Sequence, residues 1–200
     1  MKRKTFLKNI GLSAIAVSTF GFVKRVDEGF TGDCETTNDI LGPFYREDAP
    51  KRQDLVIKMT EGTIVTLKGQ VFGADCTTPL ENAKVEIWHC NADGKYDNES
   101  SDFHQRAKWQ TDGEGTYAFR TILPGKYLNG SQYRPAHIHY RVTAEGHQEL
   151  ISQLYFHGDP HIEKDPWASR PSAQRRILPI VLEDTKANLV VNFDIFLAES

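Results

Sequence analysis

The stretch Ala83–His89, with the sequence AKVEIWH, alternates apolar and polar side chains over most of its length. This pattern is typical of a β-strand with one buried face, because successive side chains of a strand point to opposite sides. On both sides of it, other short apolar stretches are bounded by Gly, Pro, Asn or Asp, as strands commonly are. The further predicted strands are Ile64–Phe72, Thr116–Ile122, His137–Val142, Leu150–Phe156, Ile177–Leu182 and Leu189–Phe196.

No part of the chain has a helical period that rivals these strands, although residues 168–176 are expected to form a short helix. The sequence DGEG at Asp112–Gly115 predicts a hairpin turn. Residues 26–53 are predicted to be irregular, with breakers at residues 31–33 and at Gly42-Pro43. About seven short strands separated by turns predict an all-β fold, an antiparallel sandwich or barrel.

The 200 residues suffice for one domain with a substantial core, and no repeat or linker divides them. Residues 1–25 are predicted to be an export signal, because a basic start precedes the apolar stretch Ile10–Val23. Residues 3–8 resemble a twin-arginine motif with Lys in its second basic place. The apolar stretch is short and rich in Ser and Gly, so no stable membrane span is expected in the mature protein. Residues 26–200 then form a single periplasmic or extracellular domain; the alternative is a cytoplasmic protein with a basic tail.

The charge of the chain is unevenly distributed. No acidic residue occurs before Asp27, whereas six basic residues do. Without those six, the chain has 18 basic and 27 acidic residues. An acidic body argues against a nucleic-acid-binding protein, because phosphate contacts require clustered Lys and Arg.

The three cysteines are Cys34, Cys76 and Cys90. In an oxidising compartment this number predicts one disulfide and one spare thiol. Cys34–Cys76 is the first choice, because it would tie the irregular N-terminal segment to the sheet. Cys90 remains an alternative partner.

The sharpest local feature is His137-Ile138-His139. In a strand, residues i and i+2 share a face, so the two imidazoles are expected to lie side by side. Neutral imidazole is a common metal ligand. Pro135 fits the start of this strand, because proline cannot donate a ladder hydrogen bond. Taken alone, the pair is more readily explained as two partly exposed strand histidines.

Two tyrosines follow predicted strands at polar turns, where catalytic groups often lie. Tyr96 ends the turn after Ala83–His89, and Tyr127 ends the turn after Thr116–Ile122. Taken singly, each tyrosine is more readily explained as a packing residue. His89 is a rival metal ligand, although the strand pattern favours a packing or hydrogen-bonding role for it.

Five segments together resemble the intradiol ring-cleavage dioxygenases, the family of catechol and protocatechuate 3,4-dioxygenases. They occur in the order found in that family and lie within about residues 40–160. They are residues 41–45 (LGPFY), 85–96 (VEIWHCNADGKY), 121–127 (TILPGKY), 134–139 (RPAHIH) and 153–160 (QLYFHGDP).

The resemblance implies a β-sandwich with long active-site loops that holds one Fe(III) per chain. The activity it implies is cleavage of a catechol-type aromatic diol by O2, between the two hydroxyl-bearing carbons, to a muconate-type diacid. Two phenolates are hard anionic donors that favour Fe(III), in contrast to the two-His, one-carboxylate set of ferrous oxygenases. By motif position the iron ligands are Tyr96, Tyr127, His137 and His139, the catalytic residues are Arg134, Tyr127 and Gln153, and the substrate-binding residues are Ile40, Pro43, Phe44 and Arg134.

The resemblance also implies separate roles for individual residues. Arg134 is expected to stabilise negative charge that develops on the ring. Tyr127 is expected to be the ligand that substrate displaces, and Tyr96 the one that stays. The chain lacks the long helical N-terminal region typical of catechol 1,2-dioxygenases. Plain catechol, a hydroxylated catechol, protocatechuate and a larger extracellular phenolic all remain open as substrates, as does a homo-oligomeric state.

Two other classes of function remain. One is a metal hydrolase that uses His137 and His139, although the sequence has no His-Glu-x-x-His motif. The other is a non-catalytic extracellular β-sandwich that binds a ligand or partner.

Overall fold

The computed structural model describes residues 17–18, 21–26, 29–32, 34–56, 61–183 and 188–200. Most of the predicted export signal at residues 1–25 therefore lies outside the described residues. Ahead of the body, three short strands pair antiparallel: β1 (Val17–Ser18), β2 (Gly21–Val26) and β3 (Gly29–Gly32). The prediction that residues 26–53 are irregular is wrong at β3, whereas residues 34–50 contain no strand.

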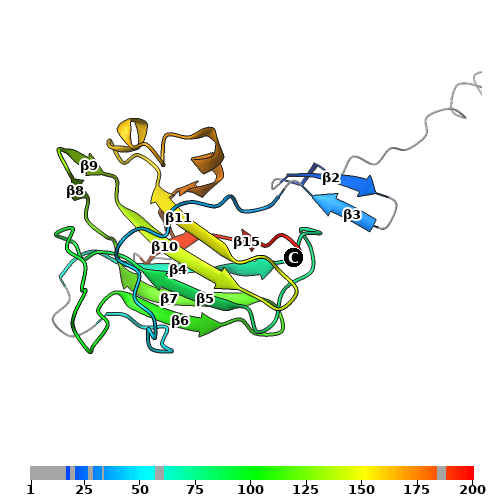
Figure 1. The fold of residues 1–200 in the computed structure, drawn as a ribbon, viewed down its shortest axis with the longest axis horizontal. Helices are drawn as coiled ribbons and strands as arrows, with labels where there is room; N and C mark the ends of the chain where they lie inside the picture. The colour runs from blue at the N-terminus through cyan, green and yellow to red at the C-terminus, as the bar shows by residue number, and fades with distance from the viewer. Residues whose placement is uncertain (1–16, 19–20, 27–28, 33, 57–60, 184–187) are drawn as a thin grey trace, which may run out of the picture.

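The first large sheet positions the candidate site (Figure 1). Its central strand β10 (His137–Thr143) pairs antiparallel with β5 (Lys84–Trp88) on one side and β11 (Leu150–Phe156) on the other. The outer strands are β6 (Arg106–Gln110) beside β5 and β12 (Ile177–Leu178) beside β11.

The second large sheet is built around β4 (Ile64–Phe72), which pairs antiparallel with β7 (Thr116–Ile122). Two strands from the C-terminal part pair parallel to β4. These are β14 (Leu189–Asn192), which also pairs with β13 (Val181–Leu182), and β15 (Ile195–Phe196). Smaller elements are the hairpin of β8 (Tyr127–Asn129) and β9 (Gln132–Arg134), and the 3-10 helices η1 (Ile162–Lys164) and η2 (Pro171–Arg176).

The core lies between the two large sheets and is made of apolar side chains from both. Strand β10 shows how the pattern works. Ile138, Tyr140 and Val142 are buried in the core, whereas His137 and His139 alternate with them and so point to the other side of the sheet. Burial of the core face therefore fixes which face presents the histidines. A shift of one residue in the pairing register would turn the histidines into the core and the apolar residues out of it.

The predicted β-sandwich is confirmed, with mixed rather than purely antiparallel sheets. Two predicted strands are each broken in two. Pro179 separates β12 from β13 and has no N–H to donate. Between β14 and β15 the chain departs from regular pairing at Asp194, whose Oδ1 accepts a hydrogen bond of 3.0 Å from the Gln70 N–H. Strand β6, with the polar sequence RAKWQ, is not among the predicted strands; it forms because β5 offers it an edge.

The turn predicted at Asp112–Gly115 is present, since the Gly115 N–H donates to the Asp112 carbonyl at 2.9 Å. The prediction of a hairpin is wrong, because the strands on either side of the turn do not pair: β6 pairs with β5, and β7 pairs with β4. The turn carries the chain from one sheet to the other. The short helix predicted at residues 168–176 is present as η2.

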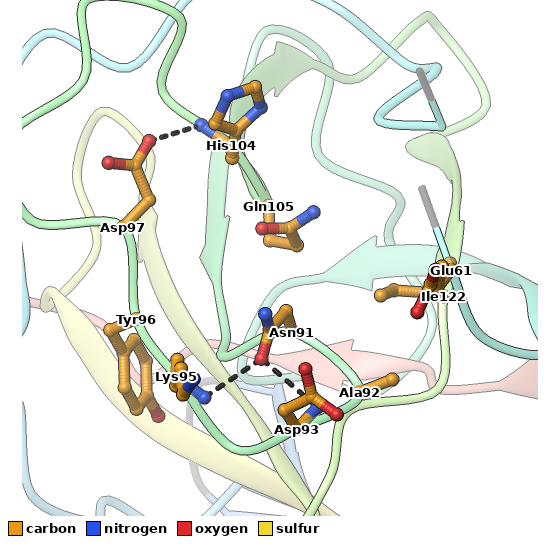
Figure 2. A pocket seen from close by; sticks show the side chains of 10 residues that line it. All are labelled: Glu61, Asn91, Ala92, Asp93, Lys95, Tyr96, Asp97, His104, Gln105 and Ile122. Carbon is orange, nitrogen blue, oxygen red and sulfur yellow. Dashed lines mark hydrogen bonds between the residues drawn. The ribbon is translucent and has the colours of Figure 1, made fainter. Parts of the chain in front are cut away.

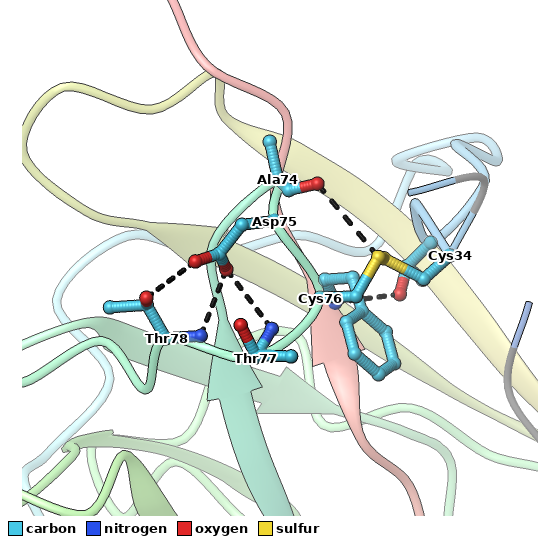
Figure 3. The surroundings of a disulfide bond; sticks show 8 residues. Cys34, Ala74, Asp75, Cys76, Thr77 and Thr78 are labelled. Carbon is cyan, nitrogen blue, oxygen red and sulfur yellow. Dashed lines mark hydrogen bonds between the residues drawn. A yellow bond between two sulfur atoms is a disulfide. The ribbon is translucent and has the colours of Figure 1, made fainter. Parts of the chain in front are cut away.

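The N-terminal segment is attached to the body by a disulfide between Cys34 and Cys76, whose Cα atoms are 6.0 Å apart (Figure 3). This confirms the first choice of pairing and leaves Cys90 as a buried free thiol. Next to the disulfide, the Thr36 N–H donates to the Phe196 carbonyl at 3.0 Å. Further along, the Asp39 N–H donates to the Ile151 carbonyl at 2.8 Å. These bonds lay residues 34–40 along the body and lead the chain to the candidate site.

Candidate metal centre

Four aromatic side chains from three parts of the chain converge on one side of the first sheet. Their ring centroids are 5.7 Å apart for Tyr96 and Tyr127, 5.6 Å for Tyr127 and His137, 5.0 Å for His137 and His139, and 6.2 Å for Tyr96 and His139. The Tyr96 hydroxyl oxygen is 3.4 Å from Nε2 of His137. The structure therefore brings together all four residues predicted as metal ligands.

Two glycines explain how the tyrosine loops come so close. A Cβ atom at Gly94 would lie 2.3 Å from the Lys126 carbonyl oxygen, and one at Gly125 would lie 2.1 Å from the Ala92 carbonyl oxygen. Both distances are far inside van der Waals contact, so a larger residue would push the loops apart. The N–H groups of Gly94 and Gly125 both donate to the Asn91 carbonyl, each at 3.0 Å. This backbone contact sets Tyr96 beside Tyr127.

The hydrogen bond of His137 determines which of its nitrogens is free. Nδ1 is 2.7 Å from the Pro135 carbonyl oxygen, which can only accept, so Nδ1 carries the proton. Nε2 then holds a lone pair, and it faces Tyr96. Metal-bound histidines commonly make this kind of bond, in which the other ring N–H is fixed by a carbonyl. Burial, followed by the positive charge of Arg134, lowers the pKa of His137 to about 4, so the imidazole is neutral at pH 7.

His139 is held by packing. Its ring stacks on Trp88 at 4.8 Å and 10°, and a Cβ at Gly42 would lie 3.1 Å from its Cε1 atom. Its Nδ1 is buried without a hydrogen-bond partner, which is costly for a polar atom. Burial, and then the neighbouring His137, lower the pKa of His139 well below its usual value. Two buried neutral imidazoles are in the protonation state that metal binding requires.

The environment of Tyr96 disfavours a phenolate in the absence of a cation. Burial, followed by the nearby Cys90 and Tyr127, raises the pKa of Tyr96 well above its usual value. A bound metal cation would reverse this effect, because the opposite charge favours the anionic form. Phe44 stacks on the Tyr96 ring at 4.2 Å and 18° and so limits its rotation.

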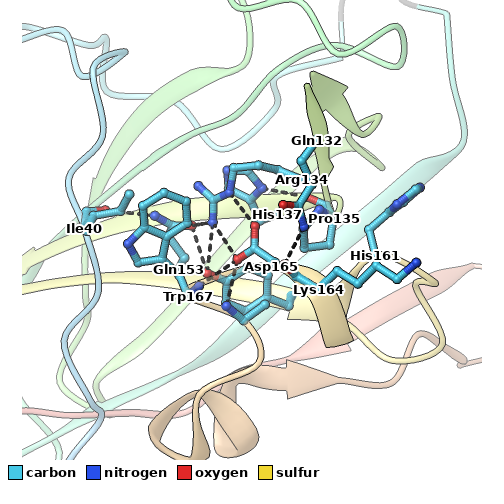
Figure 4. Close-up of polar contacts among 12 residues, drawn as sticks. Ile40, Gln132, Arg134, Pro135, His137, Gln153, His161, Lys164, Asp165 and Trp167 are labelled. Carbon is cyan, nitrogen blue, oxygen red and sulfur yellow. Dashed lines mark hydrogen bonds and ion pairs between the residues drawn. The ribbon is translucent and has the colours of Figure 1, made fainter. Parts of the chain in front are cut away.

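Arg134 lies beside the four rings in a buried polar network (Figure 4). Its Nε donates to Asp165 Oδ2 at 2.8 Å, and its Nη2 donates to Gln153 Oε1 at 3.1 Å. Burial alone would lower the pKa of Arg134, but the hydrogen bond and negative charge of Asp165 raise it above its usual value. Arg134 therefore stays charged next to Tyr127.

The predicted substrate-binding residues lie on the segment that precedes the core. The Ile40 carbonyl accepts a hydrogen bond of 2.9 Å from Gln153 Nε2, and Phe44 packs edge-on against Tyr127 at 5.9 Å. Pro43 is exposed between them. The rival ligand His89 is buried and fully hydrogen-bonded, to the Cys90 carbonyl at 2.7 Å and to Thr121 Oγ1 at 2.8 Å, as expected of a structural residue.

A family model described as "Dioxygenase" matches residues 40–199, most of the chain. This chain belongs to the intradiol ring-cleavage dioxygenase family. The resemblance predicted from five sequence segments is therefore confirmed. The family generally uses iron.

Relatives with assigned functions support this placement. A catechol 1,2-dioxygenase of Acinetobacter baylyi is 38% identical over 154 residues, which cover 65% of this chain and 49% of the relative. A chlorocatechol 1,2-dioxygenase of Cupriavidus pinatubonensis is 29% identical over 196 residues, covering 84% of this chain and 70% of the relative. The chain spans about half the length of the catechol 1,2-dioxygenases that it matches.

Solved structures share the fold over most of the chain. The dioxygenase domain of a dioxygenase and carbohydrate-binding protein fusion from a cellulolytic Streptomyces has a TM-score of 0.71 and 30% identity, and the match covers 83% of this chain and 99% of that domain. A catechol 1,2-dioxygenase from Acinetobacter has a TM-score of 0.71 and 32% identity, covering 82% of this chain and 63% of that one.

A pocket of about 380 Å³ lies along the loop that carries Tyr96 (Figure 2). Its walls come mainly from residues 91–97 and from His104, Gln105 and Ile122. Tyr96 is the only member of the four-ring cluster that lines it. This pocket is therefore not centred on the four-ring cluster.

The structure adds site residues that the motifs did not indicate. Asp165 pairs with Arg134, Trp167 lies 4.3 Å from the Arg134 guanidinium carbon, and Trp88 stacks on His139. Trp88 stands within a recognised segment and could have been noticed. Asp165 and Trp167 lie in a loop more than 25 residues after the histidines, and nothing in their spacing indicates that they return to the site.

Proposed function

We propose that this protein is an Fe(III) intradiol dioxygenase that cleaves a catechol-type ring with O2 between its hydroxyl-bearing carbons, giving a muconate-type diacid. The observation that carries the proposal is the convergence of two phenols and two neutral imidazoles, whose neighbouring ring centroids lie 5.0–6.2 Å apart. In this proposal Tyr96, Tyr127, His137 and His139 hold one iron per chain.

The donor set fits a ferric ion. Only two of the four side chains are of the nitrogen, sulfur or carboxylate types that zinc sites use, and the other two are phenols. Among the described residues, no group of three or more His, Cys, Asp or Glu side chains is arranged to hold a metal. The fixed tautomer of His137, which leaves its Nε2 free to face Tyr96, is a further feature that a bound metal ion would account for. When bound, ferric iron would supply a Lewis-acidic centre that binds the diol and draws electron density from its ring.

The remaining chemistry is assigned to side chains of this chain. Tyr127, whose ring lies beside those of Tyr96 and His137, takes on its Oη one of the two protons that a catechol must lose. The guanidinium of Arg134 faces the site next to Tyr127 and stabilises negative charge that develops on the ring. Gln153 holds Arg134 with its Oε1 and fixes Ile40 with its Nε2. Ile40, Pro43 and Phe44 form the wall against which the ring packs.

The experiment is to load the purified protein with ferric iron and measure iron content, visible spectrum and O2 uptake with catechol. A tyrosinate–iron charge-transfer band should colour the protein red-brown, and one O2 should be consumed for each ring opened. A colourless protein with full ferric occupancy would contradict the ligand set. A coloured protein that opens no catechol, hydroxylated catechol or protocatechuate would contradict the activity.

We also propose that the protein is exported to the periplasm or beyond the cell. The basic and apolar pattern of residues 1–25 and the Cys34–Cys76 disulfide support this, since disulfides persist mainly in oxidising compartments. Fractionation of producing cells, with and without the first 25 residues, tests it. Equal amounts in the cytoplasm from both forms would contradict export.

A further inference from the structure

Two buried ion pairs lie side by side behind the four-ring site. Arg134 on β9 pairs with Asp165 at 2.8 Å, and Arg176 on η2 pairs with Asp39 at 2.8 Å. All four side chains are 3% exposed or less. Only the first pair contains a residue of the proposed reaction, so the second pair needs a separate explanation.

The hydroxyl of Tyr155 connects the two pairs. It lies 3.0 Å from Asp39 Oδ2, 3.1 Å from Gln153 Oε1 and 3.3 Å from Arg134 Nη2. Tyr155 is fully buried on β11 and stands directly opposite His137 in the ladder, while Gln153 stands opposite His139. The face of the sheet that presents the histidines thus continues into this hydroxyl.

The direction of the hydrogen bonds can be worked out from the groups present. Gln153 Nε2 donates to the Ile40 carbonyl, so Gln153 Oε1 is the atom that faces Arg134 and Tyr155. The single proton of Tyr155 goes to the charged carboxylate of Asp39, because charge-assisted hydrogen bonds are the stronger ones. The phenol oxygen is then free to accept from Arg134 Nη2. A continuous path runs from Arg134 through Tyr155 to Asp39, which Arg176 holds in place.

This path fixes one edge of the Arg134 guanidinium. Asp165 binds Nε and Nη2, and Gln153 and Tyr155 bind Nη2, so none of these three partners takes Nη1. Because the guanidinium is planar, fixing Nε and Nη2 also fixes where Nη1 points.

We propose that Tyr155 is a positioning residue, which uses the Asp39–Arg176 ion pair as an anchor to hold Arg134 in the orientation that the ring reaction requires. Tyr155 touches no substrate in this proposal. The consequence for turnover rests on the proposed function, whereas the orientation of Arg134 does not.

Tyr155→Phe removes only the hydroxyl and leaves no buried partner unpaired, since Asp39 keeps Arg176 and Gln153 keeps Arg134. Iron content and the visible spectrum without substrate should match the wild type, kcat should fall about 5- to 20-fold, and KM should change less than about twofold. In a protein that already carries Arg134→Lys, Tyr155→Phe should change kcat very little, because the hydroxyl acts through the guanidinium. Tyr117→Phe is the matched control: it also removes a buried hydroxyl bond, to the Phe193 carbonyl at 2.5 Å in the other sheet, and should leave kcat unchanged.

The crystal structure of iron-loaded Tyr155→Phe is the readout that does not depend on activity. The guanidinium of Arg134 should turn within its remaining bonds to Asp165 and Gln153, and its Nη1 should move from the wild-type position. An unmoved guanidinium would overturn the proposal even if the wild type had no activity, and so would independent, multiplying effects of the two substitutions. If Tyr155→Phe does not fold, the crystal structure of the iron-loaded wild type decides instead: a Tyr155 hydroxyl beyond hydrogen-bond distance of Arg134 Nη2 or of Asp39 would overturn the proposal. A wild type without turnover would instead contradict the proposed function alone.

Discussion

At the scale of single residues, the two tyrosines of the cluster differ in their surroundings. Tyr96 is stacked face to face on Phe44 and lies within 3.4 Å of His137. Tyr127 meets Phe44 only edge-on and stands opposite a charged residue, Arg134, in the β8–β9 ladder. A tightly stacked ring is the better permanent ligand, and a ring with an alternative polar partner is the better one to be displaced.

Tyr96→Phe should therefore lose most of its iron or its colour, with or without substrate. Tyr127→Phe should still form a coloured substrate complex, but slowly and with turnover reduced about 100-fold or more. Anaerobic substrate titration of both variants by visible spectroscopy measures the difference. Identical behaviour of the two variants, or the reverse order, would show that the roles are assigned wrongly.

Arg134→Ala should keep iron and colour but lose kcat by roughly 100- to 1,000-fold, because the charge it stabilises is greatest in the transition state. The substitution leaves Asp165 buried without its cation, so urea unfolding must show that the variant is still folded at the assay temperature. Steady-state kinetics decides the role. A change confined to KM would make Arg134 a binding residue only.

At the scale of elements, the site depends on the contact between the two loops that follow β5 and β7. Their backbones approach through Gly94 and Gly125, with both N–H groups on the Asn91 carbonyl. The β8–β9 hairpin then sets Tyr127 directly opposite Arg134. A displacement of either loop would therefore move a proposed ligand and the charged residue together.

Gly125→Ala should destabilise the protein by about 2 kcal/mol or more and reduce iron binding, because its Cβ would lie 2.1 Å from the Ala92 carbonyl oxygen. Gly113→Ala is the matched control, since no atom lies within 4 Å of the Cβ it would add. Urea unfolding and iron content measure both effects. Wild-type stability and colour in the Gly125→Ala variant would show that the loop contact is not required.

At the scale of the whole molecule, the segment that carries Ile40 and Phe44 is fixed to the body at several points. At its beginning, the Cys34–Cys76 disulfide closes a loop with a sequence separation of 42. Because no strand pairs residues 34–50 with a sheet, the disulfide, the Asp39–Arg176 ion pair and individual hydrogen bonds hold this segment over the site. Among the described residues, no helix is long and apolar enough to cross a membrane.

Replacing both Cys34 and Cys76 by Ser should lower the free energy of unfolding by about 2–4 kcal/mol, since the open chain gains conformational freedom. KM should rise more than kcat falls, because the substrate wall is less well fixed while the four rings are not touched. Thermal unfolding and steady-state kinetics measure this, and reduction of the wild-type disulfide should reproduce it. A larger loss of iron than of substrate affinity would contradict the assigned role.

The sequence alone determined most strands of the two large sheets and, through the family motifs, the residues of the cluster. Alternation over Thr116–Ile122 and His137–Val142 reports burial of one face, and burial is a property that each strand carries in its own residues. The motifs around Tyr96, Tyr127 and Arg134 likewise needed no coordinates. Tertiary structure alone decided that β6 is a strand, that the turn at Asp112–Gly115 joins two sheets, and that Asp165, Tyr155 and Asp39 meet behind Arg134. The physical reason is that these features depend on partners far away in the chain. Strand pairing needs a free sheet edge, and a buried charge needs its counterion. Neither requirement produces a periodic pattern in the neighbouring sequence.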